Sequence, residues 1–268
     1  MPVLKNIILS STIHDPDLKF KNLINPVLSL IKEFFETRIV CCTPVTNDAL
    51  ISFLLEEGFI VIKGEKLRQF DIYKLAIEHS LKQIKDPNLE KIFYIDFDRL
   101  IHWLSNYPNE LAYLLEKNND VDYLHIGRTT RAFETHPSTQ KDTEGIINEI
   151  GSRILGFSEK KDIISVCFLI SKALGECIIE MKNETATGFY SSWPIIFWNL
   201  AESKRYVEVE GLEWETPDQF KEEIDEQGYQ KWLKNFQSAE EWKKRVTLLH
   251  EGLLEFYRLT DFKLHDIR

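Results

Sequence analysis

The chain has 268 residues, of which 43% are hydrophobic and 28% charged, so it has enough apolar material for a sizeable core in one or two globular domains. Its 43 acidic against 33 basic side chains give a net charge of -10, which would repel the phosphate backbone of a nucleic acid. No apolar run approaches the ~20 residues that cross a bilayer. These features exclude general nucleic-acid binding and a transmembrane segment, and we expect a cytoplasmic protein whose four cysteines are buried thiols.

Short β-rich runs alternate with helical patterns through the first half of the chain. The predicted strands are residues 7–9, 38–42, 59–62, 92–95 and 121–126, and the predicted helices lie near 22–36, 47–57 and 68–84. This alternation is typical of an α/β protein with a mostly parallel, Rossmann-like central sheet that carries helices on both faces.

The alternation weakens after residue 130. The polar segment 129–143 has no clear period, so it is predicted to be a functional or connecting loop. A strand at 163–166, a helix at 168–181 and a strand at 206–209 are expected to complete the sheet. We therefore predict one main domain over residues 1–215 and a helical C-terminal extension, 216–268, packed on it.

An acidic pair follows the fourth predicted strand, which ends abruptly at Asp96-Phe97-Asp98. Ligands of open α/β sheets bind outside the carboxyl ends of the strands. Residues i and i+2 of an extended chain point to the same side roughly 6.5 Å apart, so two carboxylates there could share Mg²⁺ or Mn²⁺ and offset the charge of a diphosphate. The alternative is structural, with Asp96 capping the next helix and Asp98 pairing with Arg99 or Lys91.

The order of elements, three βα units and then a strand ending in Asp-Phe-Asp, resembles the GT-A fold of nucleotide-sugar glycosyltransferases. Residues 94–103 (YIDFDRLIHW) and 126–137 (IGRTTRAFETHP) look like a small bacterial branch of such enzymes, and the resemblance covers roughly residues 5–215. It implies a metal-dependent glycosyltransferase that moves a sugar, expected to be a hexose, from a nucleoside-diphosphate-sugar donor to an undetermined acceptor. The implied cofactor is Mn²⁺ or Mg²⁺.

The resemblance also implies a site for each part of the donor. Residues implied to contact the nucleotide, its phosphates or its base are Ser10, Ser11, Thr12, Lys66 and Arg68. Asp96 and Asp98 would hold the metal and the ribose. The resemblance assigns neither a third metal ligand nor a catalytic base.

A second basic cluster lies at Gly127, Arg128 and Arg131, unusual in so acidic a chain. It could clamp an anionic acceptor or the diphosphate of the donor. The alternative is that the arginines form surface salt bridges with Glu134 or Asp142, which is the common outcome for exposed arginines.

The candidate for a catalytic carboxylate is Glu213, in the sequence Glu213-Trp214-Glu215, where the indole could stack on a sugar. A general base must reach the acceptor hydroxyl, which the sequence cannot show. The alternative is that Trp214 packs under the helical extension while both glutamates are solvated.

Other functions compete with glycosyl transfer. A noncatalytic module that binds a nucleotide-sugar or a protein would keep the fold without the chemistry. Phosphatases of the haloacid-dehalogenase type also use Asp-x-Asp at a strand end, but on the first strand of their domain, whereas three predicted strands precede the motif here. The sequence also leaves open a homodimer.

Overall fold

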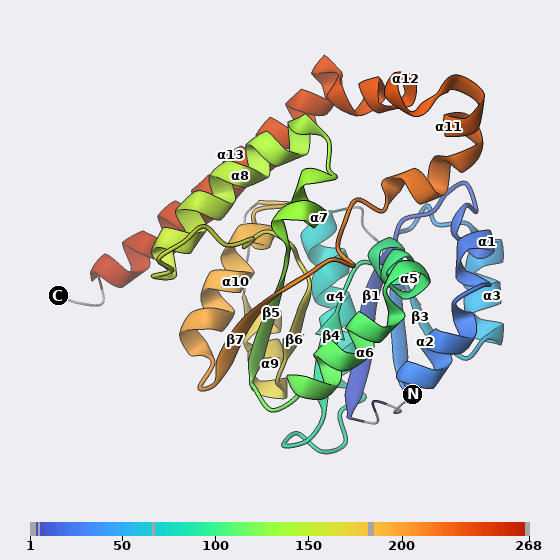
Figure 1. Ribbon diagram of the computed structural model, residues 1–268. Helices are drawn as coiled ribbons and strands as arrows, with labels where there is room; N and C mark the ends of the chain where they lie inside the picture. The colour runs from blue at the N-terminus through green and yellow to red at the C-terminus, as the bar shows by residue number, and fades with distance from the viewer. Residues whose placement is uncertain (1–3, 5, 66–67, 182–184, 266–268) are drawn as a thin grey trace.

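The computed structural model describes residues 4, 6–65, 68–181 and 185–265. Its strands are β1 (Ile7–Ile13), β2 (Arg38–Cys42), β3 (Ile60–Lys63), β4 (Lys91–Tyr94), β5 (Tyr123–Arg128), β6 (Phe168–Ile170) and β7 (Lys204–Val209). They form one seven-stranded sheet in the order β3-β2-β1-β4-β6-β5-β7 (Figure 1). Only β6 runs against its neighbours, β4 and β5, so the predicted mostly parallel sheet is confirmed.

Helices cover both faces of this sheet, as predicted. The helices before the C-terminal extension are α1 (Phe20–Ile24), α2 (Leu28–Phe34), α3 (Asp48–Glu56), α4 (Gln69–Leu81), α5 (Phe97–Asn106), α6 (Pro108–Lys117), α7 (Thr130–Glu134), α8 (Ser138–Ile154), α9 (Lys172–Glu180) and α10 (Phe189–Leu200). Side chains alternate along a strand, so Phe93 joins the apolar core under α1 to α3, α5 and α6, while Ile92 and Tyr94 join the core under α4, α9 and α10.

The C-terminal extension is helical, as expected, and lies against the sheet domain. It consists of η1 (Thr216–Phe220), α11 (Lys221–Gln227), α12 (Tyr229–Leu233), η2 (Lys234–Gln237) and the long α13 (Ala239–His265). In Figure 1, α13 runs alongside α8 and above α10. A third apolar cluster joins these three helices through Ile147, Ile195 and Phe256. No helix among the described residues combines the length and the apolar character that a membrane span requires.

Three local predictions were wrong. The strand predicted at 7–9 continues to Ile13, because Ser10 pairs with both β2 and β4 and Ser11 pairs with β2 as regular strand residues. The segment 129–143 is not a loop but contains α7 and the start of α8. Residues 163–166 form no strand, and the chain enters the sheet only at Phe168, where the structure has β6 in place of the predicted helix start.

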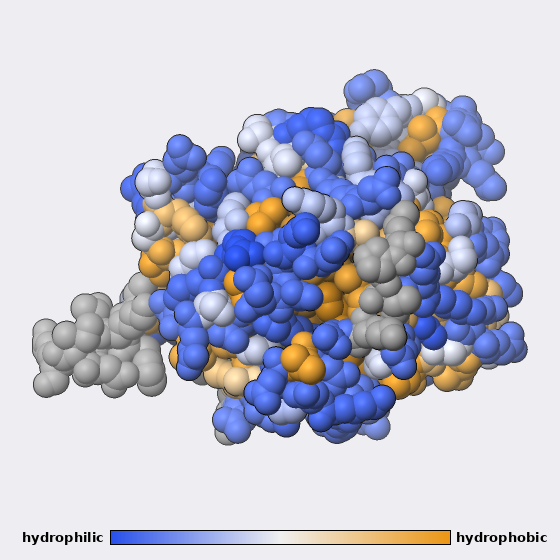
Figure 2. Space-filling model, turned by 60° about the horizontal axis from the view of Figure 1, so that its bottom comes forward, coloured by the Kyte–Doolittle hydropathy of each residue, from blue (hydrophilic) through white to orange (hydrophobic). Residues whose placement is uncertain are grey.

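The surface agrees with the acidic, highly charged composition. Figure 2 turns the lower face of Figure 1 toward the reader and shows mostly hydrophilic side chains, with apolar residues in small groups between them. Scattered apolar residues of this kind are normal on a globular protein.

Arg128 lies at the end of β5, inside the protein rather than on its surface. Its side chain is 1% exposed and bonds the carboxylates of Asp162 and Glu144, with Nη2 at 2.7 Å from Glu144 Oε2. Burial alone would raise the pKa of Asp162, but Arg128 outweighs burial and holds that pKa below its usual range. The guanidinium therefore joins β5, α8 and the segment before β6.

Removing Arg128 should be costly, because it would take away the guanidinium that the buried carboxylates of Asp162 and Glu144 bind. We expect Arg128→Met to lower the free energy of unfolding by about 3–5 kcal/mol in denaturant titrations. The matched control is Arg153→Met, since Arg153 is 78% exposed and pairs with Glu149 one turn away on its own helix. Equal losses for the two variants would contradict the structural role of Arg128.

Candidate active site

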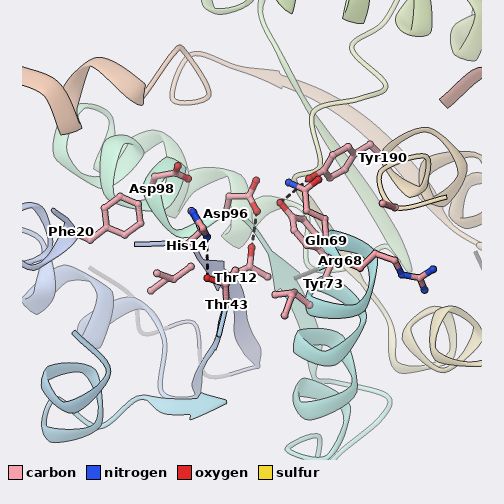
Figure 3. Close-up of a pocket in the computed structure, with 13 residues that line it drawn as sticks. Thr12, His14, Phe20, Thr43, Arg68, Gln69, Tyr73, Asp96, Asp98 and Tyr190 are labelled. Carbon is pink, nitrogen blue, oxygen red and sulfur yellow. Dashed lines mark hydrogen bonds between the residues drawn. The ribbon is translucent and has the colours of Figure 1, made fainter. Parts of the chain in front are cut away.

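A cavity of about 610 Å³ opens at the carboxyl ends of the strands, where β1, β2 and β4 meet the first residues of α4 and α5. Its lining residues are Thr12, Ile13, His14, Phe20, Thr43, Arg68, Gln69, Ile72, Tyr73, Asp96, Asp98, Ala186 and Tyr190. Figure 3 draws these residues as sticks and labels ten of them, with Asp96 and Asp98 on the same side of the cavity. We call this space the first cavity.

Asp96 stands at the N-cap position of α5 without acting as a cap. Its backbone has the extended conformation of an N-cap, but its side chain makes no cap hydrogen bond. Instead, Oδ1 accepts hydrogen bonds from the Thr12 hydroxyl at 3.0 Å and the Tyr94 hydroxyl at 3.1 Å. Burial and the charge of Asp96 raise the pKa of Tyr94 well above its usual value, so this hydroxyl keeps its proton. The carboxylate is held in place while Oδ2 has no hydrogen-bond partner among the described residues.

Asp98 lies in the first turn of α5, so the predicted extended Asp-x-Asp geometry is wrong, although both side chains line the first cavity. One oxygen, Oδ1, accepts the Arg99 backbone N–H at 2.9 Å. Burial, then the negative charges of Glu215 and Asp96, raise the pKa of Asp98 to about 7. A nearby cation would favour the charged form of this carboxylate.

The pair suits a divalent cation that is also bound by a substrate. Each carboxylate has one oxygen without a hydrogen-bond partner in the described part of the chain, and Mg²⁺ in proteins is commonly held by one or two carboxylates together with substrate phosphates. In the same residues, no group of three or more His, Cys, Asp or Glu side chains is placed to hold a metal ion. Oxygens from a diphosphate and water would have to complete the coordination.

The structure brings together only some of the residues predicted for the nucleotide. Thr12 and Arg68 line the first cavity, but Ser10 and Ser11 are buried within β1 and do not. Arg68 pairs with Asp71, and its side chain points away from Asp96 and Asp98 in Figure 3. Lys66 lies outside the described residues.

The three residues of the predicted basic cluster, Gly127, Arg128 and Arg131, have different environments in the fold. Gly127 is required inside the sheet, because a Cβ there would lie 2.2 Å from the Tyr206 hydroxyl. Arg128 is buried with its carboxylates, so it cannot clamp a substrate as predicted. Arg131 is half exposed and pairs with Glu210 and Glu213, so it also lies apart from the first cavity.

Sequence reasoning missed several cavity residues. Gln69 begins α4, Tyr190 lies in the first turn of α10, and His14 follows β1 with its Nδ1 3.0 Å from the Thr43 hydroxyl. Gln69 stands at a helix start and His14 just after a strand, and these positions could have marked both residues in the sequence as candidates for the site. Nothing in the sequence indicated that the start of α10 would reach the same cavity.

A second, smaller cavity of about 180 Å³ shares Gln69, Asp96 and Tyr190 with the first. The other polar residues that line it are Arg99, Gln140, Glu144, Glu215, Thr216 and Arg245. Glu215 was recognised in the sequence only as a neighbour of Glu213, yet it is Glu215 that faces this space. Because the two cavities share these lining residues, molecules bound in both would lie near Asp96.

Glu213 lines neither cavity. Its carboxylate bonds Arg131 at 2.5 Å, Tyr107 at 3.1 Å and His102 at 3.2 Å. Burial would raise the pKa of Glu213, but these partners, Arg131 first, outweigh it and lower the pKa. Trp214 packs against Trp232 of α12 and Phe236 of η2, which is the structural alternative considered for it.

Solved structures share this fold. Glucosyl-3-phosphoglycerate synthase from Mycobacterium tuberculosis in complex with uridine diphosphate (UDP) aligns with a TM-score of 0.50 and 14% identity, over 76% of this chain and 70% of that chain. The same synthase with Mn²⁺, UDP and glucosyl-3-phosphoglycerate gives a TM-score of 0.50 and 12% identity over the same shares. These likenesses show the GT-A-like α/β fold predicted from the sequence. No protein-family model and no curated protein matches the sequence.

His102 gives the molecule a measurable pH dependence. Its buried ring lies 2.6 Å from Asp218 of η1 and 3.2 Å from Glu213. Burial lowers the pKa of His102, but Asp218 and then Glu213 outweigh burial, and the net shift is upward. The charged ring therefore stabilises the fold fully below the unfolded-state pKa of about 6.5, and this contribution is lost as pH rises through the folded-state pKa.

We expect the stability advantage of the wild type over His102→Gln to be largest below about pH 6.5 and to shrink as the pH is raised toward 9. Denaturant titrations across this range measure it. His250→Gln, at an exposed position of α13, is the control. An advantage that grows with pH would show that His102 is neutral in the fold.

Proposed function

We propose that this chain is a glycosyltransferase that moves a sugar from a nucleoside-diphosphate-sugar donor, bound in the first cavity, to an acceptor bound beside it. Asp96 carries the proposal. Asp96 stands at an N-cap position but does not cap its helix, and Thr12 and Tyr94 hold it instead. Its second oxygen has no hydrogen-bond partner within the described ranges of the chain, so the side chain is arranged to bind something else. The shared GT-A-like fold supports the same reading.

The donor would lie across the ends of β1 and β4. Mn²⁺ or Mg²⁺ held by Asp96 and Asp98 would offset the charge that develops on the departing diphosphate. The N-terminus of α5 adds a favourable dipole at the same place. Phe20, Tyr73 and Tyr190 offer aromatic surface around the cavity for the nucleoside and sugar.

Transfer requires an acceptor hydroxyl at the anomeric carbon of the sugar. The acceptor oxygen forms its bond to that carbon as the bond to the diphosphate breaks, the bonding pair leaves with the diphosphate, and the hydroxyl proton passes to an oxygen of the departing diphosphate or to solvent. The walls around Asp96 would bring the two molecules together and limit access of water, which contributes to rate through orientation. The known synthase with the same fold is named for a phosphoglycerate product; the acceptor of this chain is a separate question.

The pair of carboxylates, Asp96 and Asp98, gives the first prediction about function. Asp96→Asn and Asp98→Asn should each keep the fold but weaken Mn²⁺-dependent UDP or GDP binding about ten- to hundredfold, because each removes a charged interaction worth about 1.5–3 kcal/mol. Isothermal titration with and without Mn²⁺ measures this. Asp225→Asn, at an exposed position of α11, is the control. If Asp98→Asn instead lowers the melting temperature by several degrees and leaves binding intact, the carboxylates are structural.

A noncatalytic nucleotide-sugar-binding module would share the binding and lack the chemistry. We expect the wild type to hydrolyse at least one nucleotide-sugar slowly in the presence of Mn²⁺, since water can replace a missing acceptor, and Asp98→Asn to abolish this release. A screen of UDP- and GDP-sugars for free nucleoside diphosphate tests it. Metal-dependent binding without any hydrolysis would favour the binding module.

A further inference from the structure

The second cavity is completed by the C-terminal extension. Arg245 and Leu248 come from α13 and Thr216 from η1, while Gln140 and Glu144 come from α8. Arg245 is fixed by Glu241 at 3.1 Å and lies 3.6 Å from Glu144, whose carboxylate also holds the buried Arg128. The wall that the extension supplies is therefore fixed to the core of the domain.

Two charged side chains in this cavity, those of Arg99 and Glu215, have polar atoms that make no hydrogen bond with the described residues. Arg99 is 16% exposed and donates from Nη1 to the carbonyl oxygen of Ser165, while its Nε and Nη2 have no hydrogen-bond partner among the described residues. Glu215 is 12% exposed in its side chain, and its buried Oε2 accepts no hydrogen bond in the same part of the chain. Nε of Arg99 and Oε2 of Glu215 are 4.0 Å apart, too far for a direct hydrogen bond.

A hydroxyl group has both the acceptor and the donor that this gap requires. Its oxygen can accept a hydrogen bond from Arg99 while its proton is donated to Glu215, and an oxygen about 2.8 Å from each atom would span the 4.0 Å between them. A carboxylate or phosphate has no proton to donate at neutral pH and would be repelled by Glu215. An ammonium group would be repelled by Arg99.

We propose that the second cavity is the acceptor subsite, that it takes a small neutral polyol such as a monosaccharide or glycerol, and that Arg99 and Glu215 hold the hydroxyl to be glycosylated. This inference rests on the proposed glycosyl transfer. The charges lining the cavity disfavour an anionic ligand, since Arg99 and Arg245 face the three acidic side chains of Asp96, Glu144 and Glu215. Its volume of about 180 Å³, beside a first cavity of about 610 Å³, suits a small molecule or the end of a longer one.

Binding is tested with defined probes. Saturation-transfer NMR of the full chain with UDP and Mg²⁺ should detect D-glucose or glycerol, and Glu215→Gln should weaken that binding about ten- to hundredfold, the effect of losing a charged hydrogen bond. Because Glu215 is a neighbouring charge of Asp98, Glu215→Gln should lower Mn²⁺-dependent UDP affinity by less than Asp98→Asn does. Glu240→Gln, on the exposed side of α13, is the control. A large loss of UDP affinity in Glu215→Gln would make Glu215 a metal ligand and overturn the acceptor role.

Measurements of nucleoside diphosphate release distinguish the remaining outcomes for the acceptor subsite. With the donor that the wild type hydrolyses, a neutral polyol should accelerate release of the nucleoside diphosphate, and Arg245→Gln should raise the polyol concentration needed for this acceleration. Stimulation by 3-phosphoglycerate but by neither polyol would overturn the assigned ligand class, as would wild-type binding of neither polyol. If the wild type fails to bind UDP or GDP with Mn²⁺, the proposed transfer itself is wrong and this inference falls with it.

Discussion

The candidate active site of this molecule depends on one electrostatic constraint. Several negatively charged carboxylates lie close together where β4 meets α5, and holding them there costs free energy. Asp96, Asp98 and Glu215 lie near one another, and burial with mutual repulsion raises the pKa of Asp98 to about 7. Such an arrangement is unfavourable unless positive charge is brought to it. Arg99 supplies part of that charge, and a divalent cation would supply the rest. Thr12 and Tyr94 hold the Asp96 carboxylate in place through hydrogen bonds to one of its oxygens.

Buried ion pairs also connect the C-terminal extension to the sheet domain. Arg128, Asp162 and Glu144 form a connected set under β5 and α8, and Glu144 continues it to Arg245 of α13. Apolar contacts between α8, α10 and α13 supply most of the attraction. The polar contacts fix the position of Arg245 relative to Asp96. The extension therefore does more than cover the sheet, because it forms a wall of the second cavity.

Much of the fold was predictable from the sequence, and the site was predictable in part. Buried strands such as Arg38–Cys42 are marked by continuous apolar runs, and Asp96 and Asp98 by their place after β4. The reversed β6 was not predictable, because three residues carry too little pattern. Arg128 was mistaken for a surface residue since its partner Asp162 is 34 residues away. Glu213 was preferred to Glu215 because only tertiary structure shows which carboxylate faces a cavity.

The most direct test of the account is a crystal structure of the wild type with UDP and Mn²⁺. We predict that the ion lies in the first cavity, about 2.2 Å from an oxygen of Asp98 or Asp96 and bound to the diphosphate, with Asp96 still bonded to Thr12 and Tyr94. A structure in which UDP binds elsewhere, or in which Asp96 turns to cap α5 and no ion is held, would contradict it.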